Sequence, residues 1–223
     1  VAGGVQNMSM IPISSAMTAG QALGFDDPFT GSSRWTTRYG TGEVSQFVGA
    51  EMMCEKWDIS RDEMEAFAIQ SHERAIRARA EGRFEPEIAP LAGIEHDEGP
   101  REPNIDKIQS LPTLVPDGNL TAACASQISD GSAAILVANE VGLKRHGLTP
   151  KARIHHISVM ADDPIMMLSA PIPATQRALE RTGLTAGDID LVEINEAFAV
   201  VPLAWLRETD FDPAKVNVNG GAI

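Results

Sequence analysis

The tetrapeptide Asn195-Glu196-Ala197-Phe198 is the part of the sequence best suited to carry chemistry. It follows Asp190-Leu191-Val192-Glu193-Ile194, whose apolar and β-branched positions predict a buried strand, and it is predicted to start a helix with an acidic first turn. Such strand-to-helix junctions are the usual place for a site in an α/β protein. Asn195 therefore either belongs to a site or caps the helix. Glu196 is either functional or a first-turn acid facing the helix dipole.

The two cysteines are weak candidates for a nucleophile. A reactive cysteine needs a basic neighbour or a helix N-terminus, whereas Cys124 lies in an Ala-Ala-Cys-Ala run that is typical of a small packed thiol. Cys54 falls on the apolar face of a predicted helix. Two cysteines so far apart form neither a disulfide framework nor a CxxC zinc site, and they fit a reducing cytoplasm.

Other polar clusters do not predict a metal or phosphate site. His155 and His156 are adjacent, so on a strand they point to opposite faces and cannot chelate one ion together. The run His96-Asp97-Glu98 has no partner at metal-ligand spacing. Gly3-Gly4 and Gly220-Gly221 lack the Lys-Ser/Thr of a phosphate loop, so they indicate close approaches of the backbone.

Composition places the chain among ordinary globular proteins. Its 223 residues are enough for one large or two small domains, with 43% hydrophobic and 22% charged residues. The net charge of −13 argues against nucleic acid as a partner. No apolar stretch approaches the roughly 20 residues of a membrane helix, and no signal peptide is evident. An anionic ligand would need a local basic spot, for which four residues are candidates: Arg34, Arg38, Arg101 and Lys107.

The first half of the chain is predicted to be irregular apart from a strand at 1–7 and two helices. One helix spans Glu43 to Trp57. A capping box at Ser60-Arg61-Asp62-Glu63 starts the other, which has Ser71 on its apolar face and stops at Gly82. Residues 92–119 hold four prolines and predict loops with a short helix at most.

From Leu120 onward the pattern predicts alternating strands and helices, hence an α/β fold. A strand leads into Asp130-Gly131, and a helix of small residues follows through Ser132 to Ala138. After a basic linker at Lys144–Lys151, the predicted order is strand 154–160, helix 173–183, strand 190–194, helix to about Arg207 and strand 216–218.

Four segments together resemble the thiolase family of acyltransferases. They are Val1 to Ser9 (VAGGVQNMS), Thr121 to Ala133 (TAACASQISDGSA), Asn195 to Phe198 (NEAF) and Asn217 to Ile223 (NVNGGAI). The resemblance implies a layered αβαβα fold of two similar halves with an inserted loop domain. It divides this chain into 1–150, the later part of the first half with a loop domain at about 8–119, and 151–223, the start of the second half.

The resemblance also implies that this is an internal fragment, incomplete at both ends. A thiolase keeps its nucleophilic cysteine upstream of the first of these segments. Its Gly-His-Pro histidine and second cysteine lie downstream of the last. The fragment alone is therefore expected to be inactive and to depend on the rest of the parent enzyme.

For the parent enzyme, the resemblance implies formation or cleavage of 3-ketoacyl-CoA, with acetyl-CoA and CoA as partners in the reaction. Cleavage leaves an enolate, which needs hydrogen-bond donors placed in advance. In the family the asparagine that matches Asn195 holds a water in such an oxyanion hole, making Asn195 the expected catalytic residue. An amide suits this role because it orients a water without titrating near neutral pH.

The CoA contacts are also implied by the resemblance. Arg101 would lie against the nucleotide, where a guanidinium pairs with phosphate or stacks on adenine, although a solvated surface arginine is the alternative. The expected contacts to pantetheine and acyl group are Ser126 by hydrogen bonding, and Ala122, Ile128, Met167, Ala197 and Phe198 by apolar contact. From pattern alone, Met167 and Phe198 would be core residues.

One departure from the family concerns the acyl group. Ser45 and Gln46 stand where many thiolases have a His-Met pair, so we hypothesise bulkier acyl chains, as in degradation of fatty acids or sterol side chains. The expected partners are CoA thioester substrates, with no permanently bound cofactor, no metal, no nucleic acid and no membrane. The parent is expected to be a cytoplasmic homodimer or homotetramer. Two alternatives are a non-catalytic CoA-binding, acyl-binding or oligomerisation module, and a ketoacyl synthase, whose two histidines these segments do not suggest.

Overall fold

The computed structural model describes residues 1–25, 28–29 and 31–223, which form two compact units. Unit 1 consists of Val1–Gly42 and Ile128–Ile157. Unit 2 consists of Glu43–Gln127 and Ser158–Ile223.

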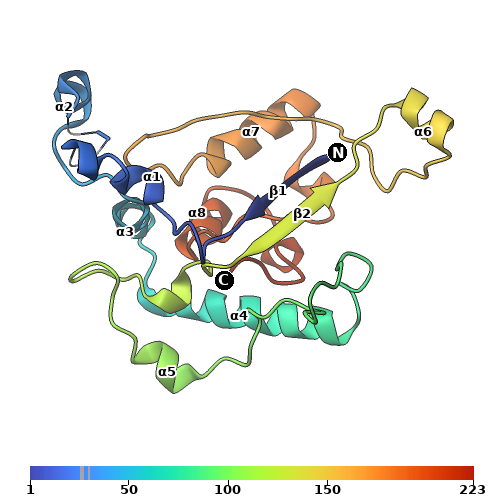
Figure 1. The fold of residues 1–223 in the computed structure, drawn as a ribbon, viewed down its shortest axis with the longest axis horizontal. Coiled ribbons are helices and arrows are strands. Elements are labelled where there is room, and N and C mark those ends of the chain that lie inside the picture. Colours follow the sequence, from blue (N-terminus) through green and yellow to red (C-terminus); the bar gives the residue numbers. More distant parts are fainter. Residues whose placement is uncertain (26–27, 30) are drawn as a thin grey trace. The chain divides into compact units, whose positions relative to one another are not determined.

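Unit 1 is built on an antiparallel pair of strands (Figure 1). β1 (Ala2–Gln6) pairs with β2 (Gly131–Ile135) in a register that sets Ala2 opposite Ile135 and Gln6 opposite Gly131. The predicted strand at 1–7 is confirmed. The prediction of a helix through Ser132 to Ala138 is wrong, because pairing with β1 satisfies the backbone groups of these small residues as a strand. A Cβ at Gly3 would lie 2.5 Å from the Ala133 oxygen, so the close approach predicted there is present, whereas the one predicted at Gly4 is wrong, since a Cβ there would have no atom within 4 Å.

The helices of unit 1 are short. They are α1 (Ser15–Thr18), the 3-10 helix η1 (Gln21–Leu23), α2 (Ser33–Tyr39) and α6 (Glu140–His146). The Asn139 side chain caps α6, and Gly147 ends it at φ 61°, so the predicted basic linker is helical as far as His146. The strand predicted at 154–160 is not formed. A strand needs a hydrogen-bonded neighbour, and no described strand pairs with this segment.

Unit 2 begins with two helices that match prediction closely. α3 (Gln46–Trp57) is capped by the Ser45 side chain, and α4 (Arg61–Ala80) carries the predicted capping box of Ser60 and Glu63. α4 is the long helix at the bottom of Figure 1. In the loop region that follows, α5 (Ile105–Gln109) is the predicted short helix, and η2 (Ala122–Cys124) is a single 3-10 turn.

The last part of unit 2 contains α7 (Pro171–Thr182), η3 (Ala186–Asp188), α8 (Val200–Arg207) and η4 (Pro213–Lys215). α7 starts two residues before the predicted position and ends at Gly183, as predicted. The predicted strands at 190–194 and 216–218 are reduced to isolated parallel bridges, which join Val192 to Val216 and Val218 to Gly220. Among the described residues no strand lies beside them to extend either bridge into a ladder.

The core of unit 2 lies between α3, α4, α8 and the η2 turn. Its larger buried residues are Met53, Cys54, Met64, Leu120, Cys124, Phe198, Val200 and Val201. A second cluster joins Ile172, Trp205, Phe211 and Val216. Phe47 on α3 is 45% exposed, and its ring contacts that of the core residue Phe198. Because the apolar face of α8 packs in this core, the helix holds in place the segment that precedes it, which contains the tetrapeptide Asn195–Phe198.

No helix among the described residues is long and apolar enough to cross a membrane. Within the same residues, no group of three or more His, Cys, Asp and Glu side chains is arranged to hold a metal ion.

Candidate functional site

The tetrapeptide Asn195–Phe198 is not the start of a helix: Asn195 and Glu196 have no regular secondary structure, Ala197 lies at a bend and Phe198 forms a bridge. α8 begins at Val200 with Ala199 as its N-cap residue. The prediction that the tetrapeptide starts the helix is therefore wrong, and so are the alternatives that Asn195 caps the helix and that Glu196 is its first-turn acid. The physical reason is that longer-range hydrogen bonds hold this backbone in another conformation.

The second half of the tetrapeptide is bound to the segment 124–126. Ser126 donates its N–H to the Ala197 oxygen over 3.0 Å, and Ala199 donates its N–H to the Cys124 oxygen over 2.8 Å. Ala125 and Phe198 form an antiparallel bridge between these bonds. Three residues that the sequence predicted at one site, Ser126, Ala197 and Phe198, are thus neighbours.

Phe198 is both a core residue and a boundary of this site. It is buried, and its ring meets that of Phe47 edge-on, with centroids 5.7 Å apart and an interplanar angle of 69°. Since Phe47 is partly exposed, the pair connects the core to the surface near the tetrapeptide.

Glu196 is completely buried and accepts three hydrogen bonds. Oε1 accepts one from Asn217 Nδ2 over 2.8 Å. Oε2 accepts one from Ser71 Oγ over 2.7 Å and one from the Ile223 N–H over 3.1 Å. None of the ion pairs among the described residues includes Glu196. Its charge is therefore compensated by neutral donors.

The Asn217 side chain is fixed by the backbone of Ile194. Oδ1 accepts the Ile194 N–H over 2.8 Å, and Nδ2 donates to the Ile194 oxygen over 2.9 Å. Asn217 has φ 46°, a left-handed conformation that Asn tolerates better than most residues.

Gly220 and Gly221 approach these groups closely, as predicted. A Cβ at Gly221 would lie 2.2 Å from Glu196 Cδ, and one at Gly220, where φ is 81°, would lie 2.6 Å from the Ser71 oxygen. Gly221 also donates its N–H to Ser71 Oγ over 3.0 Å, so the C-terminal segment runs beside α4 (Figure 1).

Arg101 is exposed, and its Nη1 donates to the Gly99 oxygen over 3.0 Å. Gly99 lies against the Gln127 side chain, since a Cβ there would be 2.6 Å from Oε1. Gln127 in turn donates its N–H to the Ala222 oxygen over 3.0 Å. This chain of contacts places the Arg101 loop beside the segment that carries Ser126.

His72 follows Ser71 on α4 and is buried, with an Nδ1 atom that has no hydrogen-bond partner among the described residues. Burial lowers the pKa of His72, and the positive charge of Arg101 lowers it further, while Glu196 acts in the opposite direction. A neutral imidazole is therefore favoured next to the Glu196 carboxylate.

The remaining predicted residues are less closely tied to the tetrapeptide. Ala122 is an exposed residue of η2. Met167 is half-buried at φ 46°, and the preceding Met166 packs against the core that contains Phe198. Ile128 belongs to unit 1 and is 70% exposed. Of the other basic candidates, Arg34 and Arg38 lie in unit 1 and Lys107 lies on α5.

The expectation of inert cysteines is confirmed. Cys54 and Cys124 are both buried. Burial raises the pKa of Cys54 to about 12 and also raises the pKa of Cys124. Neither thiol has the exposure or the lowered pKa that a nucleophilic cysteine needs.

Sequence reasoning missed the partners of Glu196, which are Ser71 and Asn217. A partial signal was present, because Ser71 is a polar residue on the apolar face of a predicted helix, where an unpaired hydroxyl is unfavourable.

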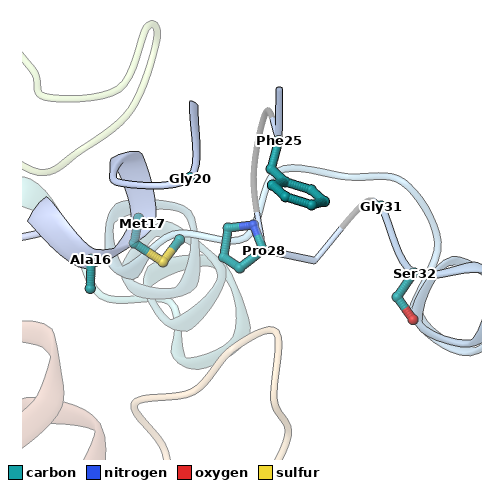
Figure 2. Close-up of a pocket in the computed structure, with 7 residues that line it drawn as sticks. All are labelled: Ala16, Met17, Gly20, Phe25, Pro28, Gly31 and Ser32. Carbon is teal, nitrogen blue, oxygen red and sulfur yellow. The ribbon is translucent and has the colours of Figure 1, made fainter. Parts of the chain in front are cut away.

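Unit 1 contains a separate cavity of about 390 Å3, and Figure 2 shows its lining of Ala16, Met17, Gly20, Phe25, Pro28, Gly31 and Ser32. The Ser32 hydroxyl accepts the Trp35 N–H as the cap of α2. The lining includes none of the predicted site residues, so we give the cavity no role in the site.

Comparisons with known proteins agree with the four sequence segments. The family model of the thiolase N-terminal domain matches residues 1–141, and that of the thiolase C-terminal domain matches residues 148–223. The chain therefore belongs to the thiolase family. It adopts part of the thiolase α/β fold: human mitochondrial 3-ketoacyl-CoA thiolase superposes with a TM-score of 0.75 at 41% identity, over 78% of this chain and 46% of that one.

Two relatives show the range of the similarity. Steroid 3-ketoacyl-CoA thiolase FadA6 of Mycobacterium tuberculosis is 58% identical over the whole of this chain and 56% of its own length. Acetyl-CoA acetyltransferase of Paracoccus denitrificans is 37% identical over the whole of this chain and 60% of its own length. The chain thus spans little more than half the length of the curated relatives it matches.

Proposed function

We propose that the natural protein containing this chain is a thiolase that cleaves 3-ketoacyl-CoA with CoA to release acetyl-CoA, or runs the reverse reaction. Family membership supports this proposal together with one structural observation: Asn195 lies exposed between two residues whose positions are fixed. The chain would supply the side chains that bind the CoA thioester and stabilise the enolate.

Asn195 would orient a water toward the enolate oxygen. Its neighbours Ile194 and Glu196 are both hydrogen-bonded to Asn217, whereas the Asn195 side chain makes no hydrogen bond within the described residues. Because the residues on both sides of Asn195 are hydrogen-bonded, its amide would be in place as a donor before the charge develops, which is the requirement for stabilising a transition state.

CoA would run along the side of unit 2 that carries Arg101 and Ser126. Arg101 would contact the nucleotide, and Ser126 would hydrogen-bond the pantetheine arm. The support is geometric, since the Ser126 backbone is bound to Ala197 and the Arg101 loop lies against Gln127. The proposed apolar contacts are Ala122, Ile128, Met167, Ala197 and Phe198.

The nucleophile of the proposed reaction would come from another part of the natural protein. Cys54 and Cys124 are unsuitable because their thiols are buried and their pKa values are raised. A cysteine elsewhere would take the acyl group and pass it to free CoA, which divides the reaction into two easier steps.

A bulky acyl chain is the proposed substrate class, in the degradation of fatty acids or sterol side chains. The FadA6 relative, 58% identical, is named a steroid 3-ketoacyl-CoA thiolase. In this chain Ser45 caps α3 through its side chain, and Gln46 is the exposed first residue of that helix. A cytoplasmic homodimer or homotetramer without a permanent cofactor is proposed with this activity.

The test uses the full-length natural protein with CoA and two substrates, acetoacetyl-CoA and a 3-ketoacyl-CoA bearing a steroid side chain. We expect acetyl-CoA and the shortened acyl-CoA by mass spectrometry, with the higher kcat/KM on the steroid substrate. A preference for acetoacetyl-CoA would contradict the substrate class. Binding of CoA without turnover of either substrate would favour the non-catalytic module instead.

A further inference from the structure

Glu196 connects its own segment to two others, α4 and the C-terminal segment 217–223. Its carboxylate receives hydrogen bonds from Ser71 on α4, from the Asn217 side chain and from the Ile223 backbone. A buried carboxylate is costly unless it is well hydrogen-bonded, so this arrangement needs all of its donors.

The direction of every bond in this network is fixed by geometry. The Asn217 amide cannot be turned over, because it would then present its NH2 to the Ile194 N–H and its oxygen to the Ile194 carbonyl. Ser71 Oγ accepts the Gly221 N–H and donates its proton to Glu196. All three groups that hydrogen-bond to Glu196 are therefore donors to its carboxylate oxygens.

The same Asn217 side chain binds the residue before Asn195 and the residue after it. Its amide pairs with the Ile194 backbone, and its Nδ2 also reaches Glu196 Oε1. One side chain consequently holds the Ile194 backbone before Asn195 and the Glu196 side chain after it. Gly221 also packs directly against the Glu196 carboxylate, where there is no room for a Cβ.

We propose that Glu196 is a positioning residue, which together with Asn217 holds Asn195 in the orientation that turnover requires. The inference rests on the proposed function, because it assigns an effect on thiolysis. Glu196 itself does not touch the reacting atoms. Loss of its carboxylate would displace Asn195 and lower kcat more than it alters KM for the CoA thioester.

Glu196→Gln in the full-length protein is the main test. Whichever way the new amide turns, its NH2 faces a donor, either Asn217 Nδ2 or the pair of Ser71 and Ile223 N–H. A displacement of about 1 Å costs about 100-fold in rate, so we expect kcat to fall about 100-fold with KM changed less than about threefold. Ser71→Ala removes one donor and leaves the Asn217 contacts, so its kcat should fall about tenfold by the same argument.

Glu65→Gln is the matched control. Glu65, which lies on α4, is a buried carboxylate like Glu196. Its partner is Arg61 at 2.7 Å, and it lies outside the site. This variant should unfold at a lower temperature and keep the kcat of the wild type per folded molecule. If Glu196→Gln and Ser71→Ala also kept the wild-type kcat per folded molecule, the positioning role would be overturned.

Hydrogen exchange separates this inference from the proposed function. If the wild type turned over no 3-ketoacyl-CoA, the proposed function would fail. The positioning role of the hydrogen bonds to Glu196 would then be tested on the Gly221 and Ile223 amides. We expect these amides to exchange at least about tenfold faster in Glu196→Gln than in Glu65→Gln. Equal exchange in the two variants would overturn this role whatever the activity. If Glu196→Gln did not fold, kcat and amide exchange in Ser71→Ala would decide the question.

Discussion

Asn217 Nδ2 lies 2.8 Å from Glu196 Oε1, and the same nitrogen lies 2.9 Å from the Ile194 oxygen. One amide group therefore binds alternate residues on either side of Asn195. Because both contacts are made by a side chain that is itself buried, the local backbone around Asn195 has little freedom to shift. This arrangement has consequences for stability as well as for the proposed catalysis.

Gly221→Ala should disturb the site through sterics alone. The added Cβ would lie 2.2 Å from Glu196 Cδ, so either the carboxylate or the C-terminal segment must move. We expect a loss of about 2–3 kcal/mol in the free energy of unfolding, measured from urea denaturation. The control is Gly187→Ala, where the nearest atom would be at an ordinary 3.6 Å from the Cβ. Equal stability of the two variants would contradict the close approach.

His72 should make stability fall under mildly acidic conditions. Its pKa lies below the ordinary 6.5 in the folded state, first because of burial and then because of the Arg101 charge. The unfolded chain therefore takes up the proton first, and the free energy of unfolding decreases as pH falls from about 6.5 toward the folded-state pKa. His72→Leu should remove this decrease and the unpartnered Nδ1 with it.

The measurement for His72 is the urea midpoint at several pH values between 8 and 5. His96→Gln is the control, because His96 is exposed and the variant should keep the wild-type pH dependence. An unchanged slope in His72→Leu would show that another group causes the pH dependence.

Arg101→Ala should weaken CoA binding without changing the fold. The side chain is exposed, and its hydrogen bond is to the carbonyl of nearby Gly99. A lost charge-assisted contact to phosphate is worth about 1.5 kcal/mol, so we expect the Kd for CoA to rise about tenfold by calorimetry. Lys107→Ala, on exposed α5, should leave the Kd within about twofold if Arg101 carries the contact. Equal Kd values for the two variants would contradict the proposed nucleotide site.

Cys54 and Cys124 should resist alkylation while the protein is folded. Reaction requires the thiolate, and burial raises the pKa of Cys54 to about 12 and also raises that of Cys124. Treatment with iodoacetamide at pH 8 should leave both unmodified by mass spectrometry of peptides, whereas guanidinium should expose both. Rapid labelling of either residue in the native protein would contradict its burial.

Local features of the fold were predictable because their causes are local. The Ser60 and Glu63 capping box and the left-handed Gly183 mark helix ends through hydrogen bonds and φ values that involve only nearby residues. The close approaches at Gly3, Gly220 and Gly221 were likewise indicated by residue type, and the structure confirms them.

Features that depend on distant partners were predicted incorrectly or not at all. Ser132 to Ala134 suit a helix by their small size, yet pairing with β1, which begins at Ala2, makes them a strand. The tetrapeptide 195–198 has the local pattern of a helix start, but the segment 124–126 binds it in an extended form. Nothing local separates these alternatives, since each satisfies the same backbone groups.

The sequence by itself determined the thiolase family, the capped start of α4, the glycine end of α7 and the presence of Asn195 and Glu196 in a polar segment. Only the tertiary structure decided that Ser71, 125 residues from Glu196, and Asn217, 21 residues away, donate to the same carboxylate. Hydrogen bonds between such distant residues leave no periodic signal in the chain, because they arise when packing of α4 and α8 brings the segments together.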